Sequence, residues 1–161
     1  MRKIISFLIL IVLLPSPVFA GAPVPGDKAP NFSLSSLKGE KFDLDALKGK
    51  VVLVGMFHIC VPCMNQAMEL DKVREKIKSD KLVVLGINTS GDSRQAVEDY
   101  LRGFPHAVNF PYLLDPKMSF DKAYIQRDMP TVLIIDSKGV LKARSPSVGA
   151  DQLVPYIKKL M

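Results

Sequence analysis

The sequence has no tryptophan, two cysteines and two histidines among its 161 residues. A structural zinc site takes four Cys, His or carboxylate ligands. The cysteine pair would therefore need two further ligands, which this composition does not readily supply, so no metal or other cofactor is expected. No basic run exceeds two residues, as in Lys158-Lys159, although the formal net charge is +6. This charge pattern indicates a solvated surface and no nucleic-acid site.

The N-terminal residues have the pattern of an export signal. Arg2 and Lys3 precede the apolar run Ile4–Leu14, and two prolines end that run. These features predict a signal peptide over residues 1–20, cleaved after Ala20. The alternative is an uncleaved anchor, but the apolar run is shorter than the roughly 20 residues that span a bilayer. Either interpretation places the domain outside the cytoplasm, in the periplasm or on the exterior of the cell envelope.

The rest of the chain has the length of one domain. Removing residues 1–20 leaves 161 − 20 = 141 residues, and the formal charge falls from +6 to +4 because only Arg2 and Lys3 are lost. Residues 21–30 contain three prolines and a glycine at position 26, which predicts an extended linker. The single domain is therefore expected over residues 31–161.

Apolar runs and helical spacing alternate along this domain. Strands are expected at residues 31–34, 41–44, 51–54, 82–87, 110–114, 131–135 and 140–144. Helices are expected at residues 61–79, 93–103, 118–125 and 151–160, and Pro155 must either kink the last helix or lie in its first turn. The alternation predicts an α/β fold with a central mixed sheet covered by helices on both faces, and a short hairpin made by the first two strands.

The expected helix at residues 61–79 has one apolar and one charged face. Its apolar residues recur at helical spacing, at Met64, Ala67, Leu70, Val73 and Ile77. Three acid–base pairs three residues apart are expected to lie on the exposed face: Glu69–Lys72, Asp71–Arg74 and Glu75–Lys78.

The two cysteines form a Cys-x-x-Cys pair at a strand-to-helix junction. Cys60 and Cys63 follow the apolar segment Val51–Met56 and precede the helix at 61–79. A helix N-terminus has unpaired N–H groups and a partial positive charge, which favour a thiolate. A purely structural disulfide would usually close a longer loop, because the chain-entropy gain grows with loop length. The placement therefore indicates a dithiol that exchanges disulfides.

Four segments together carry a family resemblance. They are Ala-Pro-Asn-Phe-Ser-Leu at 29–34, Leu-Lys-Gly-Lys-Val-Val-Leu-Val at 47–54, Cys-Val-Pro-Cys at 60–63, and Met-Pro-Thr-Val-Leu-Ile-Ile-Asp at 129–136 followed by Lys138-Gly139. With these segments the sequence resembles the thioredoxin-like superfamily, and specifically the exported TlpA/ResA/DsbE-type thiol-disulfide oxidoreductases with a redoxin or AhpC/TSA-like domain. The resemblance implies a thioredoxin-like fold with an N-terminal β-hairpin extension.

The resemblance also implies roles for site residues. Cys60 would be the exposed nucleophile and Cys63 the buried resolving thiol. Pro130 would follow a cis peptide bond beside the disulfide, and the backbone of Met129 would pair with an extended substrate strand. The alternative for Pro130 is an ordinary proline at the start of a strand.

The activity implied by the resemblance is reduction of other exported proteins. The protein would be a monomer that reduces specific cysteine-containing proteins such as apocytochrome c. A membrane thiol electron donor would return it to the dithiol state, since it works in an oxidising compartment.

The chain departs from the family where a proton acceptor is expected. Thioredoxin has a buried acid six residues before its first cysteine, and that position here is Val54. TlpA-type proteins often have a glutamate three residues after the second cysteine, and that position here is Gln66. The aromatic residue that often precedes the first cysteine is replaced by Ile59. These departures predict unusual tuning of the two thiols.

Two opposite effects on the thiols follow from general chemistry. The helix N-terminus should hold the pKa of Cys60 below that of a free thiol, whereas burial should raise the pKa of Cys63. His58 is the nearest titratable side chain in sequence, and as an imidazolium it would favour the Cys60 thiolate. The alternative for His58 is an exposed loop histidine without a role.

Other activities of related chemistry fit the sequence less well. A peroxiredoxin has a hydroxyl residue three positions before its peroxidatic cysteine, and that position here is Phe57. A Cu(I)-binding metallochaperone would find soft ligands in Cys60, Cys63, a histidine and methionines. The copper chaperones of this fold use a Cys-x-x-x-Cys spacing, which is absent here. Covalent haem attachment needs a histidine where Met64 stands.

Four methionines lie near the cysteines in sequence or are expected to lie across the site: Met56, Met64, Met68 and Met129. Filling of gaps in the core is the expected role, and an adaptable docking surface for unfolded chains is the alternative. His106 is expected to be a structural or exposed loop residue.

Overall fold

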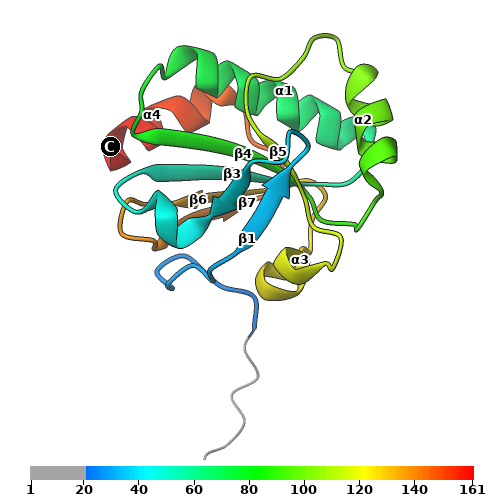
Figure 1. Ribbon diagram of the computed structural model, residues 1–161. Helices are drawn as coiled ribbons and strands as arrows, with labels where there is room; N and C mark the ends of the chain where they lie inside the picture. Colours follow the sequence, from blue (N-terminus) through cyan, green and yellow to red (C-terminus); the bar gives the residue numbers. More distant parts are fainter. Residues whose placement is uncertain (1–20) are drawn as a thin grey trace, which may run out of the picture.

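A seven-stranded mixed sheet runs through the computed structural model, which describes residues 21–161 (Figure 1). The strand order across the sheet is β2-β1-β5-β4-β3-β6-β7. The strands are β1 (Ser33–Ser36), β2 (Lys41–Asp43), β3 (Val51–Phe57), β4 (Leu82–Asn88), β5 (Tyr112–Leu114), β6 (Thr131–Ile135) and β7 (Leu141–Ser145). The signal peptide expected over residues 1–20 lies outside the described residues.

Parallel and antiparallel pairs occur in the same sheet. β3 and β4 are parallel, as are β4 and β5, whereas β3 pairs with β6, β6 with β7, β1 with β5 and β1 with β2 in the antiparallel direction. β3 lies between β4 and β6, and all seven of its residues are buried. This burial explains the continuous apolar run in its sequence. The predicted mixed sheet and the N-terminal hairpin are therefore confirmed.

The helices cover both faces of the sheet (Figure 1). They are α1 (Val61–Lys76), α2 (Arg94–Arg102), α3 (Ser119–Tyr124) and α4 (Ala150–Leu160), and residues Leu44–Leu47 form a short 3-10 helix, η1. α1, α2 and α4 lie above the sheet in Figure 1, and α3 lies below it. The predicted α/β architecture is confirmed.

Alternate residues of β3 face two separate hydrophobic cores. Leu53 and Phe57 belong to the core that includes the buried sides of α1 and α4. Val54 and Met56 belong to the core on the α3 side. Successive side chains of a strand point to opposite faces, so the apolar run of β3 joins the two cores. The end of β3 is consequently held from both sides, immediately before the cysteine pair.

Several element boundaries differ from the predictions. α1 ends at Lys76, three residues earlier than expected, because Ile77 leaves the helical conformation and is buried in the core. Leu44 is not the end of a strand but the first residue of η1, and the side chain of Asp43 accepts a hydrogen bond from the Asp45 N–H at the start of that turn. Pro155 lies inside α4, beyond its first turn.

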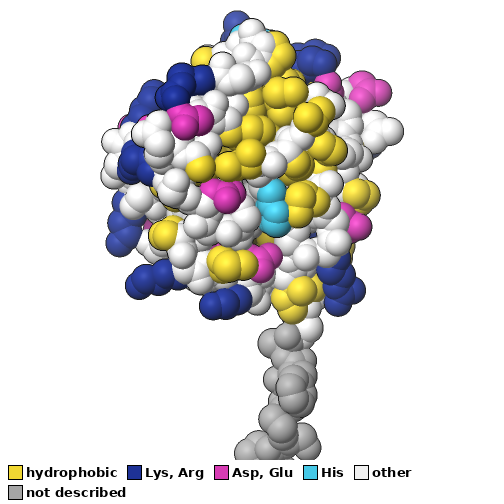
Figure 2. Space-filling model, turned by 90° about the vertical axis from the view of Figure 1, so that its right-hand side faces the viewer, with side chains coloured by type: hydrophobic (Ala, Val, Ile, Leu, Met, Phe, Trp, Pro, Cys, Tyr) yellow, Lys and Arg dark blue, Asp and Glu magenta, His cyan; other side chains and the backbone are white. Residues whose placement is uncertain are grey.

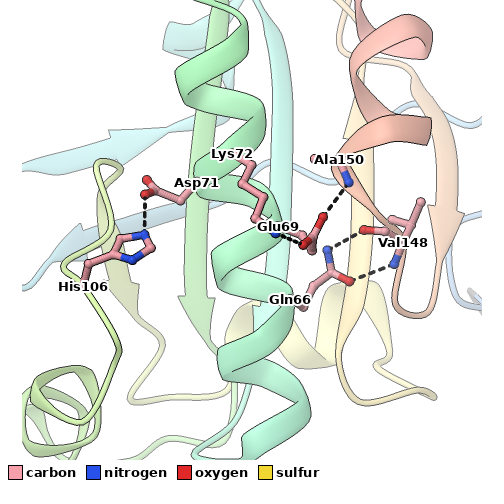
Figure 3. Close-up of polar contacts among 7 residues, drawn as sticks. All are labelled: Gln66, Glu69, Asp71, Lys72, His106, Val148 and Ala150. Carbon is pink, nitrogen blue, oxygen red and sulfur yellow. Dashed lines mark hydrogen bonds and ion pairs between the residues drawn. The ribbon is translucent and has the colours of Figure 1, made fainter.

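Of the three acid–base pairs expected on the exposed face of α1, Asp71–Arg74 has a buried member, and Glu75–Lys78 extends past the end of the helix at Lys76. Lys72 and Glu69 do pair, with 2.6 Å between Nζ and Oε1. Asp71, however, is fully buried, and its carboxylate accepts the Asn109 N–H at 2.7 Å. The same carboxylate contacts the His106 ring at 3.4 Å (Figure 3). Asp71 therefore fastens the loop after α2 to α1. His106, whose side chain is 58% exposed, is a loop residue as expected.

The segment before β1 is attached to the domain near the β6–β7 turn. The Gly26 N–H donates to Leu141 O at 2.8 Å, and the Ala29 N–H donates to Gly139 O at 2.9 Å. Ala29 itself is buried. Among residues 21–161, no helix has the length and apolar character required to cross a membrane.

Candidate active site

Cys60 and Cys63 form a disulfide at the start of α1. Cys60 is the N-cap residue, with extended backbone angles, and its Sγ accepts a hydrogen bond from the Cys63 N–H at 3.2 Å. Pro62 lies in the first turn, where its missing N–H has no helical partner to lose. The Cα atoms of the two cysteines are 5.2 Å apart. The local sequence thus places the first sulfur at the positive end of a helix.

The two sulfurs differ in their access to solvent. Cys60 is partly exposed, whereas Cys63 is 0% exposed and belongs to the hydrophobic core beneath α1. The Cys63 sulfur accepts a hydrogen bond from the His58 N–H, at 3.4 Å. A reagent from solution can therefore approach Cys60 more readily than Cys63.

The His58 side chain and the Met129–Pro130 loop lie at the same end of the sheet. Thr131 pairs with Met56, so Pro130 precedes β6 beside the end of β3. The Met129–Pro130 peptide bond is cis. His58 and Met129 line a hollow of about 180 Å³, together with polar residues of the α3–β6 loop.

Exposed apolar side chains surround this end of the molecule. Figure 2 shows hydrophobic side chains in a continuous area on the side of the protein where α1 begins in Figure 1. Ile59, Val61 and Met129 are 43%, 64% and 46% exposed, respectively. An apolar peptide segment can therefore contact the protein beside the disulfide. Of the methionines, Met56 is fully buried and fills the core, whereas Met129 is a surface residue.

The side chain of Gln66 is fixed by hydrogen bonds to the backbone of another segment. Its side chain is 3% exposed, and its amide makes two hydrogen bonds with one residue: the Nε2 group donates to Val148 O at 2.9 Å, and Oε1 accepts the Val148 N–H at 2.8 Å (Figure 3). A neutral amide satisfies both backbone groups, which a carboxylate does not. Gln66 therefore fixes the loop before α4 against α1.

A carboxylate one turn after Gln66 on α1 also has hydrogen-bond partners. Glu69 accepts the Ala150 N–H at 2.8 Å, at the start of α4, and pairs with Lys72 (Figure 3). The hydrogen bond from Lys72 and the one from Ala150 hold the pKa of Glu69 below its ordinary value. Glu69 is consequently a weak base. At the position of the buried acid of thioredoxin, Val54 places only an apolar side chain in the core.

A tyrosine that the sequence did not single out contacts the active-site backbone. The Tyr100 hydroxyl, from α2, donates to the Cys60 carbonyl oxygen at 2.6 Å. Burial raises the pKa of Tyr100 above its ordinary value, so the hydroxyl keeps its proton. The helical spacing of Val97, Tyr100 and Leu101 could have indicated that Tyr100 faces inward, but it contains no signal for this particular partner.

Residues 25–144 match the AhpC/TSA family. The Bacillus subtilis thioredoxin-like protein YneN is 35% identical over 120 residues, which are 73% of this chain and 68% of YneN. The B. subtilis thiol-disulfide oxidoreductase ResA is 31% identical over 125 residues, which are 76% of this chain and 68% of ResA. The chain belongs to the AhpC/TSA family. Within that family it is a ResA-type thiol-disulfide oxidoreductase with a thioredoxin-like fold.

Solved structures show the same fold. A thiol:disulfide interchange protein DsbE from Chlorobium tepidum is 24% identical, with a TM-score of 0.72 over 86% of this chain and 96% of that chain. StoA from B. subtilis is 23% identical, with a TM-score of 0.68 over 82% of this chain and 98% of that chain. These likenesses show the thioredoxin-like fold of this ResA-type oxidoreductase.

Proposed function

We propose that the protein is an exported reductant of specific cysteine-containing proteins, such as apocytochrome c. The difference in exposure between Cys60 and Cys63 is the observation that carries the order of events. In the reduced protein the Cys60 thiolate attacks a substrate disulfide, forms a mixed disulfide and releases one substrate thiolate. The Cys63 thiolate then attacks the Cys60 sulfur and releases the second substrate thiolate. Two electrons pass to the substrate, and the Cys60–Cys63 disulfide forms.

Export and recharging complete this proposal. The N-terminal signal pattern would deliver the protein to the periplasm or the exterior of the cell envelope. That compartment is oxidising, so a membrane thiol donor must reduce the Cys60–Cys63 disulfide after each cycle. The dithiol itself carries both electrons, so this scheme requires no bound cofactor. The protein is expected to work as a monomer.

Substrate would bind along the Met129–Pro130 loop and the exposed apolar side chains beside Cys60. Met129 is 46% exposed, and Met161, at the far end of α4, is 40% exposed. Met129→Glu should raise KM for an apolar cysteine peptide about fivefold, since it removes apolar contact and adds a charge. Met161→Glu is the matched control and should leave KM unchanged. An equal effect of the two changes would exclude this docking surface.

Trapping of the mixed disulfide tests the proposed roles. Cys63→Ser should accumulate a stable mixed disulfide between Cys60 and a model substrate, because the resolving sulfur is missing. Cys60→Ser should accumulate none, because Cys63 is buried. The adducts are read by non-reducing electrophoresis and peptide mass. Equal trapping by the two variants, or trapping by Cys60→Ser alone, would contradict the assignment.

A further inference from the structure

The backbone of Cys60 is held by a residue from a different helix. Tyr100 lies 40 residues later in the sequence, and its hydroxyl bonds the Cys60 carbonyl at 2.6 Å. The same carbonyl accepts the Met64 N–H at 3.0 Å, the first hydrogen bond of α1. Tyr100 packs edge-on against Phe104, with ring centroids 4.9 Å apart. The phenol is therefore held in place, and it adds a second donor to the oxygen that begins the helix.

This contact bears on the state of the Cys60 sulfur in two ways. It holds the extended N-cap backbone in which Sγ accepts the Cys63 N–H, a geometry that favours a negative sulfur. It also partly neutralises the negative end of the Cys60 carbonyl dipole, which would otherwise repel a thiolate in the same residue. Burial keeps the Tyr100 phenol protonated and able to donate.

We infer that Tyr100 is a positioning residue for disulfide exchange, whose hydroxyl holds the Cys60 N-cap in the conformation that stabilises the attacking thiolate. The inference rests on the proposed role of Cys60 as the attacking thiol. Tyr100 does not touch the substrate or transfer a proton in this scheme. It acts through the Cys60 carbonyl alone, so removal of one oxygen atom is sufficient to test it.

Tyr100→Phe keeps the ring and its packing on Phe104 but removes the hydroxyl. In the reduced variant, the pKa of Cys60 should rise, and about two- to fivefold less thiolate should be present near neutral pH. The rate of Cys60 alkylation by iodoacetamide, followed against pH and assigned by peptide mass, measures this change. The reduction potential of the Cys60/Cys63 couple should become more negative, because the reduced state loses stabilisation of its thiolate.

Tyr124→Phe is the matched control. The Tyr124 hydroxyl also donates to a backbone carbonyl, that of Pro30 at 2.7 Å, but it lies in the core on the α3 side of the sheet. The control should lower Tm and leave the Cys60 titration and the reduction potential unchanged. A Tyr100→Phe variant that lowers Tm but titrates like the wild type at Cys60 would overturn the inference.

The proposed attack by Cys60 and the proposed role of Tyr100 are contradicted by different results. Trapping by Cys60→Ser alone would contradict the proposed attack by Cys60, whatever the outcome for Tyr100. Normal trapping by Cys63→Ser, together with an unshifted Cys60 titration in Tyr100→Phe, would contradict only the role of Tyr100.

Discussion

The two sulfurs of one disulfide lie in opposite surroundings. Cys60 is partly exposed at a helix N-terminus, and Tyr100 holds its carbonyl. Cys63, one helical turn later, is fully buried among apolar side chains and receives only the backbone N–H of His58 from outside the helix. The first environment favours a thiolate, whereas the second favours a neutral thiol. The comparison indicates that attack of Cys60 on a substrate disulfide is fast. Removal of the proton from Cys63 then limits resolution of the mixed disulfide.

Neither Gln66 nor Glu69, the two polar residues of α1 closest in sequence after Cys63 on this face, is available to accept the proton of Cys63. Gln66 is occupied by the Val148 backbone, and Glu69 is occupied by Lys72 and the N-terminus of α4. Resolution should therefore be slow at neutral pH and faster in alkali, while the first attack remains fast.

The largest effect is expected from Gln66→Glu. The carboxylate would still accept the Val148 N–H, but its other oxygen would face the Val148 carbonyl, which a protonated carboxyl can satisfy. The new acid would exchange a proton near neutral pH and assist Cys63. We expect resolution to accelerate about tenfold at pH 7, measured by single-turnover decay of the mixed disulfide.

Gln152→Glu is the matched control for this change. Gln152 is an exposed residue of α4 and lines the same surface hollow as Gln66. The Gln152→Glu substitution adds the same charge but leaves the hydrogen bonds between Gln66 and Val148 intact, so resolution should stay at the wild-type rate. Resolution that is unchanged in Gln66→Glu, or equally accelerated in both variants, would mean that no proton acceptor is missing beside Cys63.

Glu69→Gln should have a smaller effect, and on stability alone. The amide keeps an acceptor for the Ala150 N–H but loses the pairing with Lys72 and the charge at the start of α4. The expected loss is about 0.5 kcal/mol in the free energy of unfolding. The resolution rate should not change, because Glu69 is a structural carboxylate. Slower resolution in this variant would show that Glu69 accepts the proton of Cys63.

The stability difference should depend on pH with a definite sign. The pKa of Glu69 is lowered in the folded protein, from an ordinary value of 4.5. A lowered folded-state pKa contributes stability above the unfolded-state pKa, and that contribution is lost as pH falls through the folded-state pKa. The free energies of unfolding of the wild type and Glu69→Gln, measured by urea denaturation, should therefore differ at pH 7 and become equal in acid. A difference that persists at low pH would exclude the charge as its source.

The sequence predicted the parts of the fold that depend on local pattern. The apolar run of β3, the helix after the cysteines and the strand after Pro130 were each identified because burial imposes a period or a continuous run. Boundaries such as the end of α1 at Lys76 were less accurate, since tertiary packing of Ile77 decides them.

The contacts that set the properties of the site were less accessible from the sequence. Gln66 could be named as a departure from the family, but its partner Val148 lies 82 residues away in a loop. The spacing within α1 predicted that Asp71 is a surface charge. Its burial depends on the loop that contains Asn109, which is distant in the sequence. Tyr100 reaches Cys60 because α1 and α2 share one hydrophobic core, a tertiary arrangement that residue spacing within α2 does not specify.

The central claim is that the two thiols of the reduced protein have different affinities for a proton. The most direct test is the pH dependence of alkylation of each cysteine in the reduced wild-type protein, separated by peptide mass. Cys60 should show a pKa below the free-thiol value of about 8.5, and Cys63 a pKa above it. Equal pKa values, or a lower value for Cys63 than for Cys60, would contradict the account.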